Sequence, residues 1–190
     1  MKTQFQKILD QIHPEVDIRK LEKTATRAQN AYRKVTNGYS IDAESLCKKS
    51  LIENSERKSI VIASNIFFIS MCEHHLMPFF GTCHIVYEAN KYIIGLSKIT
   101  AIVEAYAHRL QLQEKLTQEI AACLFNHLQP FGVGVYMQAD HCCLKLTHTE
   151  AHSTQLTTLF GLGSLQKSHE LSLILQNKDI KHEHTSLVTQ

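Results

Sequence analysis

The chain of 190 residues is long enough for one domain with a hydrophobic core, or for such a domain and a helical arm. Hydrophobic residues make up 44% and charged residues 20%, as in an ordinary soluble protein, and the net charge of +2 is too small to indicate a nucleic-acid or membrane partner. We find no secretory signal and no apolar run of membrane-spanning length, so the six cysteines indicate reduced thiols and a cytoplasmic protein.

The N-terminal part of the chain predicts a helical arm. Apolar side chains recur at helical spacing over residues 3–12, where Pro14 ends the run. A second helix is predicted from Asp17 to Val35, before Asn37-Gly38. Residues 40–58 are polar and predict a connecting loop. We therefore expect an arm and linker over residues 1–50.

The pattern changes at Ser59 to strands and then to long helices. In order, the sequence predicts a strand from Ser59 to the Cys72 turn, a hairpin of 79–87 with 92–96, a helix from an N-cap at Ser97 to Leu110, a helix over 113–128 that continues or restarts it, a strand over 133–138, an antiparallel partner at Leu144 and Leu146, and a weak helix over 168–175. This order predicts an α+β fold, with two long helices on one face of an antiparallel four-stranded sheet.

The expected catalytic domain covers residues 51–165 and is followed by a C-terminal tail over 166–190. An antiparallel sheet of four strands has two open edges. Because an open edge is stabilised by pairing with another copy, self-association is expected.

The stretch from Met71 to Leu76 has the spacing of a metal site, because Cys72 and His75 lie three positions apart. A catalytic zinc ion takes three protein ligands and leaves one position for water. The only other cluster of His and Cys is His141-Cys142-Cys143, which would supply the third ligand from one of its two cysteines. No CxxC pair is present, so the pattern does not indicate a structural zinc finger.

The three remaining cysteines, Cys47, Cys83 and Cys123, have no neighbours at metal-ligand spacing. A lone thiol of this kind usually packs as a small hydrophobic side chain. We therefore expect all three to be buried in the core.

Four motifs resemble the GTP cyclohydrolase I family in order and spacing. They are Cys72-Glu73-His74-His75, Gly95-Leu96-Ser97-Lys98-Ile99, the run from Arg109 to Thr117, and His141-Cys142-Cys143. The resemblance covers roughly residues 17–163. It implies a T-fold (tunnelling-fold) subunit that assembles into a ring-shaped homodecamer, with each active site built from neighbouring subunits.

The resemblance also implies a role for each matched residue. Zinc would be held by Cys72, His75 and Cys143, proton transfer would fall to His74 and His141, the guanine edge would be bound by Glu114 with Gln113, and Ser97, Lys98 and Arg27 would also contact the substrate. The implied reaction opens the guanine ring of GTP at C8, releases formate and closes a pterin ring, giving 7,8-dihydroneopterin triphosphate.

The sequence departs from the family where the triphosphate would bind. Three positions that carry a cation in the family hold Ala101, Thr147 and Asn30. A triphosphate carries about four negative charges and normally needs several Arg or Lys partners. Three interpretations therefore stay open: a divergent GTP cyclohydrolase I, a paralogue acting on a guanine-type substrate without the triphosphate, and a non-catalytic ring protein that binds a ligand or partner.

Overall fold

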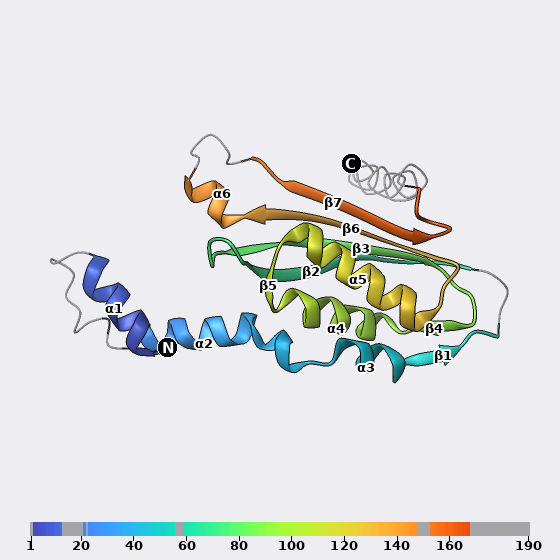
Figure 1. Cartoon of the computed structure of the whole chain (residues 1–190), viewed down its shortest axis with the longest axis horizontal. Helices are drawn as coiled ribbons and strands as arrows, with labels where there is room; N and C mark the ends of the chain where they lie inside the picture. The colour runs from blue at the N-terminus through green and yellow to red at the C-terminus, as the bar shows by residue number, and fades with distance from the viewer. Residues whose placement is uncertain (1, 13–20, 22, 56–58, 148–152, 168–190) are drawn as a thin grey trace, which may run out of the picture.

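The protein, seen here as a computed structural model, is described over residues 2–12, 21, 23–55, 59–147 and 153–167. In chain order its elements are α1 (Lys2–Ile12), α2 (Thr24–Val35), η2 (Asn37–Ser40), α3 (Ala43–Lys48), β1 (Leu51–Glu53), β2 (Ile60–Cys72), β3 (Pro78–Glu88), β4 (Tyr92–Ile94), α4 (Leu96–Ala107), β5 (Leu110–Gln111), α5 (Gln113–Leu128), β6 (Gly132–His141), α6 (Cys142–Thr147) and β7 (Leu156–Gly163). Figure 1 shows α4 and α5 lying along the sheet and the arm of α1 and α2 extending beyond one of its ends.

The main sheet has the strand order β5-β2-β3-β6-β7. Its four long strands are antiparallel to their neighbours, and the two-residue β5 joins the outer edge of β2 in parallel. The predicted α+β fold, with an antiparallel four-stranded sheet, is confirmed, and β5 is a short addition to it. This is the architecture of a T-fold subunit.

The core lies between the sheet and the two long helices. Side chains that repeat every three or four residues on α4 and α5 meet strand side chains that alternate toward the same face. The largest contributors include Ile99, Ile102, Leu116, Ile120, Leu124, Ile85 and Met137, each at most 1% exposed. Burying one such side chain contributes about 1.5–3 kcal/mol, so this layer holds the helices on the sheet. The predicted burial of Cys47, Cys83 and Cys123 in this core is confirmed.

The strand register brings distant parts of the chain to one end of the sheet. Met71 pairs with Pro78 across β2 and β3, and Phe79 pairs with His141 across β3 and β6. The turn after Cys72 therefore lies beside the start of α6, at the left end of the sheet in Figure 1.

Two predicted strand pairings were wrong. The strand β4 does not form a hairpin with β3 but pairs with β1, inside the stretch predicted as a loop. The loop prediction also missed α3, which Asp42 caps by accepting the backbone N–H of Ser45 at 2.9 Å. A helix of six residues and a strand of three are too short for hydrophobic periodicity to indicate them.

The partner strand of β6 was also predicted wrongly. Leu144 and Leu146 lie in α6, where the Thr147 hydroxyl donates to the carbonyl of Cys143 at 2.8 Å. The strand beside β6 is β7, later in the chain. Two apolar residues in alternation fit a strand and a helical turn equally well, so the sequence did not discriminate between them.

The helix boundaries differ modestly from the prediction. The second helix begins at Thr24, with Lys23 at its N-cap, and not at Asp17 as predicted. Residues 13–20 and the helix predicted over 168–175 lie outside the described part of the chain. The helix α4 begins at Leu96, with Gly95 and not Ser97 at its N-cap. It ends at Ala107, and α5 is a separate helix, so the second of the two predicted alternatives is correct.

Candidate metal centre and active site

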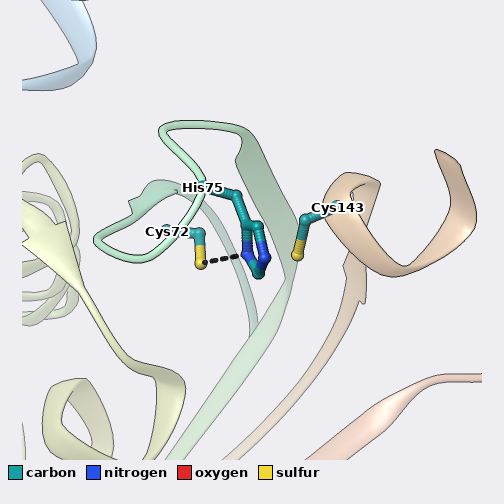
Figure 2. Close-up of side chains that lie close together, drawn as sticks. All are labelled: Cys72, His75 and Cys143. Carbon is teal, nitrogen blue, oxygen red and sulfur yellow. Dashed lines mark hydrogen bonds between the residues drawn. The ribbon is translucent and has the colours of Figure 1, made fainter. Parts of the chain in front are cut away.

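A tight turn between β2 and β3 brings Cys72 and His75 to the same side of the backbone. The N–H of Leu76 donates to the carbonyl of Cys72, and the N–H of Cys72 donates to the carbonyl of Met77, both at 2.9 Å. Leu76 closes the turn with a φ of 52°, a left-handed conformation that leucine rarely adopts. As a result, the Cys72 Sγ lies 3.8 Å from the His75 Nδ1 (Figure 2).

Cys143, in the first turn of α6, supplies a third possible ligand atom. The two Sγ atoms and a ring nitrogen of His75 all lie within 4.8 Å of one another. Figure 2 shows the three side chains converging, two from the β2–β3 turn and one from α6. Within the described residues this is the one such group of three His, Cys, Asp or Glu side chains, and it contains Cys143 and not Cys142.

The donor set fits a zinc ion. Burial raises the pKa of the Cys143 thiol, and the neighbouring Cys72 raises it further. Two thiolates this close repel each other, so a cation between them is what allows both to lose their protons. Two thiolates and one imidazole are the ligands of a known class of catalytic zinc site, in which the fourth position stays open for water.

His141, at the end of β6, is held in one orientation and one tautomer. Its ring stacks on Phe79, with centroids 4.6 Å apart and planes within 5°, and its Nε2 lies 2.9 Å from the Gln113 Oε1. The Gln113 Nε2 lies 3.1 Å from the carbonyl of Met137 and 3.0 Å from that of Leu156. Because carbonyls only accept, the amide oxygen of Gln113 must face His141. His141 therefore donates from Nε2, which leaves Nδ1 with the lone pair of the neutral ring.

The electrostatic surroundings favour this neutral ring. Burial lowers the pKa of His141, while the negative charges of Glu114 and Asp140 act against that shift. Glu114 is exposed in the first turn of α5, within electrostatic reach of His141. His74 is exposed beside His75, with the two rings edge to face and 6.2 Å between centroids. These side chains thus surround the same end of the sheet.

Gln113 has a contact that the sequence did not indicate. It was predicted to bind substrate, which stays a prediction, but it is 1% exposed and its amide bonds to His141 and to main-chain carbonyls. No local pattern signals such a contact, because β6 and β7 reach Gln113 only in the folded chain.

Two other predicted substrate residues, Ser97 and Lys98, lie far from the metal ligands within one chain. They line a cleft of about 490 Å³ together with Lys49, Ser50 and Ile52. The helix α4 runs from this cleft to the metal end of the sheet (Figure 1), and its 12 residues span about 18 Å at 1.5 Å per residue. Arg27 is an exposed residue of α2.

The positions that depart from the family carry short, uncharged side chains. The hydroxyl of Thr147 bonds to its own helix through the carbonyl of Cys143. Ala101 is half-buried on α4, and Asn30 is exposed on α2. None of the three replaces the missing positive charge.

The chain is similar in sequence to known proteins. A sequence profile described as GTP cyclohydrolase I matches residues 1–177. Relatives named GTP cyclohydrolase 1 are 36% identical over 164 residues in Parabacteroides distasonis (86% of this chain and 84% of the relative), 40% over 148 residues in Porphyromonas gingivalis (78% and 76%), and 39% over 163 residues in Leptospira biflexa (86% and 88%). A solved structure titled as the archaeosine synthase QueF-Like in the apo form has a TM-score of 0.49 at 14% identity, covering 58% of this chain and 99% of that one.

The fold and the site define a T-fold protein with a Cys/His/Cys group suited to a metal ion. The chain belongs to the GTP cyclohydrolase I family. None of the helices in the described residues is both long and apolar enough to span a membrane.

Proposed function

We propose that this protein is a zinc-dependent cyclohydrolase that opens the imidazole ring of GTP at C8, releases formate and forms 7,8-dihydroneopterin triphosphate. The observation that carries the proposal is the convergence of Cys72, His75 and Cys143 beside His141 in a member of this family. When bound by these three side chains, zinc lowers the pKa of a coordinated water and so supplies a nucleophile near neutral pH.

The protein's own residues then place the base and move protons. Glu114 accepts hydrogen bonds from the ring N–H and the amino group of guanine. Adenine lacks this pair of donors, so the contact selects against adenine. His141 accepts a proton from the attacking water at its Nδ1 and passes it to the ring nitrogen that leaves C8, while Gln113 holds its Nε2. His74, exposed on the turn, is the second candidate for proton transfer.

A complete active site requires more than one copy of the chain. Lys98 and Ser97 lie at the opposite end of the sheet from Cys72, so a triphosphate bound by them and a base at the metal of the same chain would be too far apart. In the described residues the sheet ends at β7 on one side, and on the other side β5 pairs with only Met71 and Cys72 of β2. Edge pairing between copies supports a homo-oligomeric ring, and the family resemblance implies a decamer. The free thiols support a cytoplasmic location.

The cleft that Lys98 lines carries groups that could bind the triphosphate. Lys49 lines it as well, so two lysines and two serine hydroxyls gather there. Charge-assisted hydrogen bonds of this kind suit phosphate oxygens, and Lys49 would offset part of the charge missing at Ala101. This cleft favours a phosphorylated substrate.

A second candidate is ring opening of a guanine-type substrate without the triphosphate. It is favoured by Ala101, Asn30 and Thr147, which remove three cations. Because one charge-assisted contact contributes on the order of 1.5–3 kcal/mol, losing three would weaken triphosphate binding greatly. The third possibility, a non-catalytic ring protein, leaves the retained metal-ligand and acid-base residues without a role.

The test is an absorbance assay of ring opening with GTP, GMP, guanosine and guanine as substrates. Our proposal expects GTP to have the highest kcat/KM, with formate released in equal amount. Comparable kcat/KM for GMP or guanosine would establish the second candidate instead. Zinc-loaded protein that opens none of the four would overturn both.

A further inference from the structure

Tyr32, on α2, reaches the metal turn from outside it. Its hydroxyl donates to the main-chain carbonyl of Leu76 at 2.8 Å, across 44 residues of sequence. Leu76 directly follows His75 and lies between the two proposed ligands of the turn and the start of β3. The contact therefore joins the N-terminal arm to the segment that orients a metal ligand.

The residue that Tyr32 holds is the strained one. Leu76 has a φ of 52°, and its exposed side chain (49%) has little packing to keep it there. Left-handed backbone is disfavoured for residues with a branched side chain and persists where surrounding contacts hold it. Within the turn, the N–H of Leu76 is bonded to the Cys72 carbonyl, and Tyr32 holds the carbonyl of the same residue. Both peptide groups that flank the Leu76 Cα are thus fixed.

The position of Tyr32 is itself well supported. The Thr36 hydroxyl donates to the Tyr32 carbonyl at 2.7 Å, near the end of α2. The ring of Phe5, on α1, packs against the Tyr32 ring with centroids 5.2 Å apart. The Phe5 contact thus holds the Tyr32 ring on the arm, and α2 itself contacts β2 and η2.

We propose that Tyr32 is a positioning residue for the metal site, which keeps the left-handed Leu76, and so the His75 ring, in the arrangement that binds the ion. The inference rests on the proposed function only in taking Cys72, His75 and Cys143 as zinc ligands. Tyr32 is not one of the three convergent ligand residues and acts through the carbonyl of Leu76. The bond raises the fraction of metal-free protein in which the turn has the metal-binding conformation. Its loss is therefore expected to lower the affinity for the metal ion.

The test measures the affinity of the full-length, assembled protein for zinc by competition with a chelator, and for cobalt(II) by its thiolate absorbance. Tyr32→Phe keeps the ring against Phe5 and removes only the hydroxyl. Since one hydrogen bond is lost, we expect both metals to bind about 3- to 10-fold more weakly. Tyr87→Phe is the matched control, because its hydroxyl accepts the N–H of Ile94 at 3.4 Å, away from the metal end.

A second substitution separates positioning from a general loss of stability. Glycine adopts positive φ about as readily as negative φ, so Leu76→Gly makes the left-handed turn less dependent on Tyr32. In the Leu76→Gly background, Tyr32→Phe should change metal affinity by less than about 2-fold, as a double-mutant cycle detects.

Three results would overturn the inference: unchanged metal affinity in Tyr32→Phe, an equal loss in Tyr87→Phe, or an undiminished loss in the Leu76→Gly background. These outcomes do not depend on turnover. If the wild-type protein binds zinc but opens no guanine ring, the proposed function fails while the role of Tyr32 is still measured. If the wild-type protein binds no zinc, both fail together.

Discussion

The rings of Phe79 and His141 stack across β3 and β6, with planes within 5° and centroids 4.6 Å apart. The two residues are direct partners in the strand register. Phe79 is fully buried and belongs to the core, so it presents a rigid surface to the imidazole. A proposed proton-transfer group is thus fixed by the packing of the sheet itself, and the amide of Gln113 fixes its tautomer.

Replacing Gln113 with Leu should lower kcat by about 10- to 100-fold, because His141 then loses the acceptor that keeps the proton on its Nε2. The zinc content should stay at the wild-type value. Steady-state kinetics and metal analysis check this, and Gln138→Ala is the control, since that side chain bonds to the exposed Gln155. Equal kcat in wild type and Gln113→Leu would contradict this role.

Substituting Cys143 with Ser should abolish zinc binding and turnover together. Wild-type protein should contain about one zinc per chain. The adjacent Cys142 lies outside the group of convergent ligand atoms, so Cys142→Ser should keep its metal. Metal analysis after dialysis distinguishes the two variants, and the assignment of ligands is wrong if Cys142→Ser is the one that loses zinc.

The cleft beside Lys98 predicts a substrate effect at Lys49. Lys49→Met should raise KM for GTP by about 10-fold, since it removes one charge-assisted contact to phosphate, and should leave guanosine kinetics unchanged. Its neighbour Lys48 lies 3.9 Å from Glu44 on an exposed face, so Lys48→Met is a matched control. An identical KM for GTP in both variants would show that Lys49 does not contact the triphosphate.

Protonation of Asp140 in acid should reduce the stability that its contact with Lys145 of α6 contributes. Hydrogen bonds from Lys145 and then Gln155 hold the pKa of Asp140 below its ordinary value of 3.8. A depressed carboxyl pKa contributes stability above the unfolded-state value, and that stability is lost as pH falls through the folded-state value. Lys145→Met should therefore weaken the fold at about pH 6 and weaken it less at about pH 3. Urea unfolding of metal-free protein at both values measures this, and an equal loss at both would exclude the charge effect.

Much of the fold was predictable because its long elements have strong periodicity. The helix α5 was predicted with its observed bounds, and the turn after Cys72 was predicted from ligand spacing. The register of β3 with β6 is not encoded by any local pattern, so the stacking of His141 on Phe79 could not be foreseen. The same holds for Tyr32, whose bond to Leu76 spans 44 residues. The separation of Lys98 from Cys72 depends on the tertiary structure, so no local sequence pattern predicts it.

Because Lys98 and Cys72 lie at opposite ends of the subunit, the proposed site between copies predicts that a second chain can compensate for damage at one end. Cys143→Ser and Lys98→Met subunits should each be inactive alone. When equal amounts are denatured and reassembled together, about a quarter of the pockets between copies should combine an intact metal end with an intact lysine. The two lesions would then complement each other in trans, whereas a chain carrying both would rescue neither.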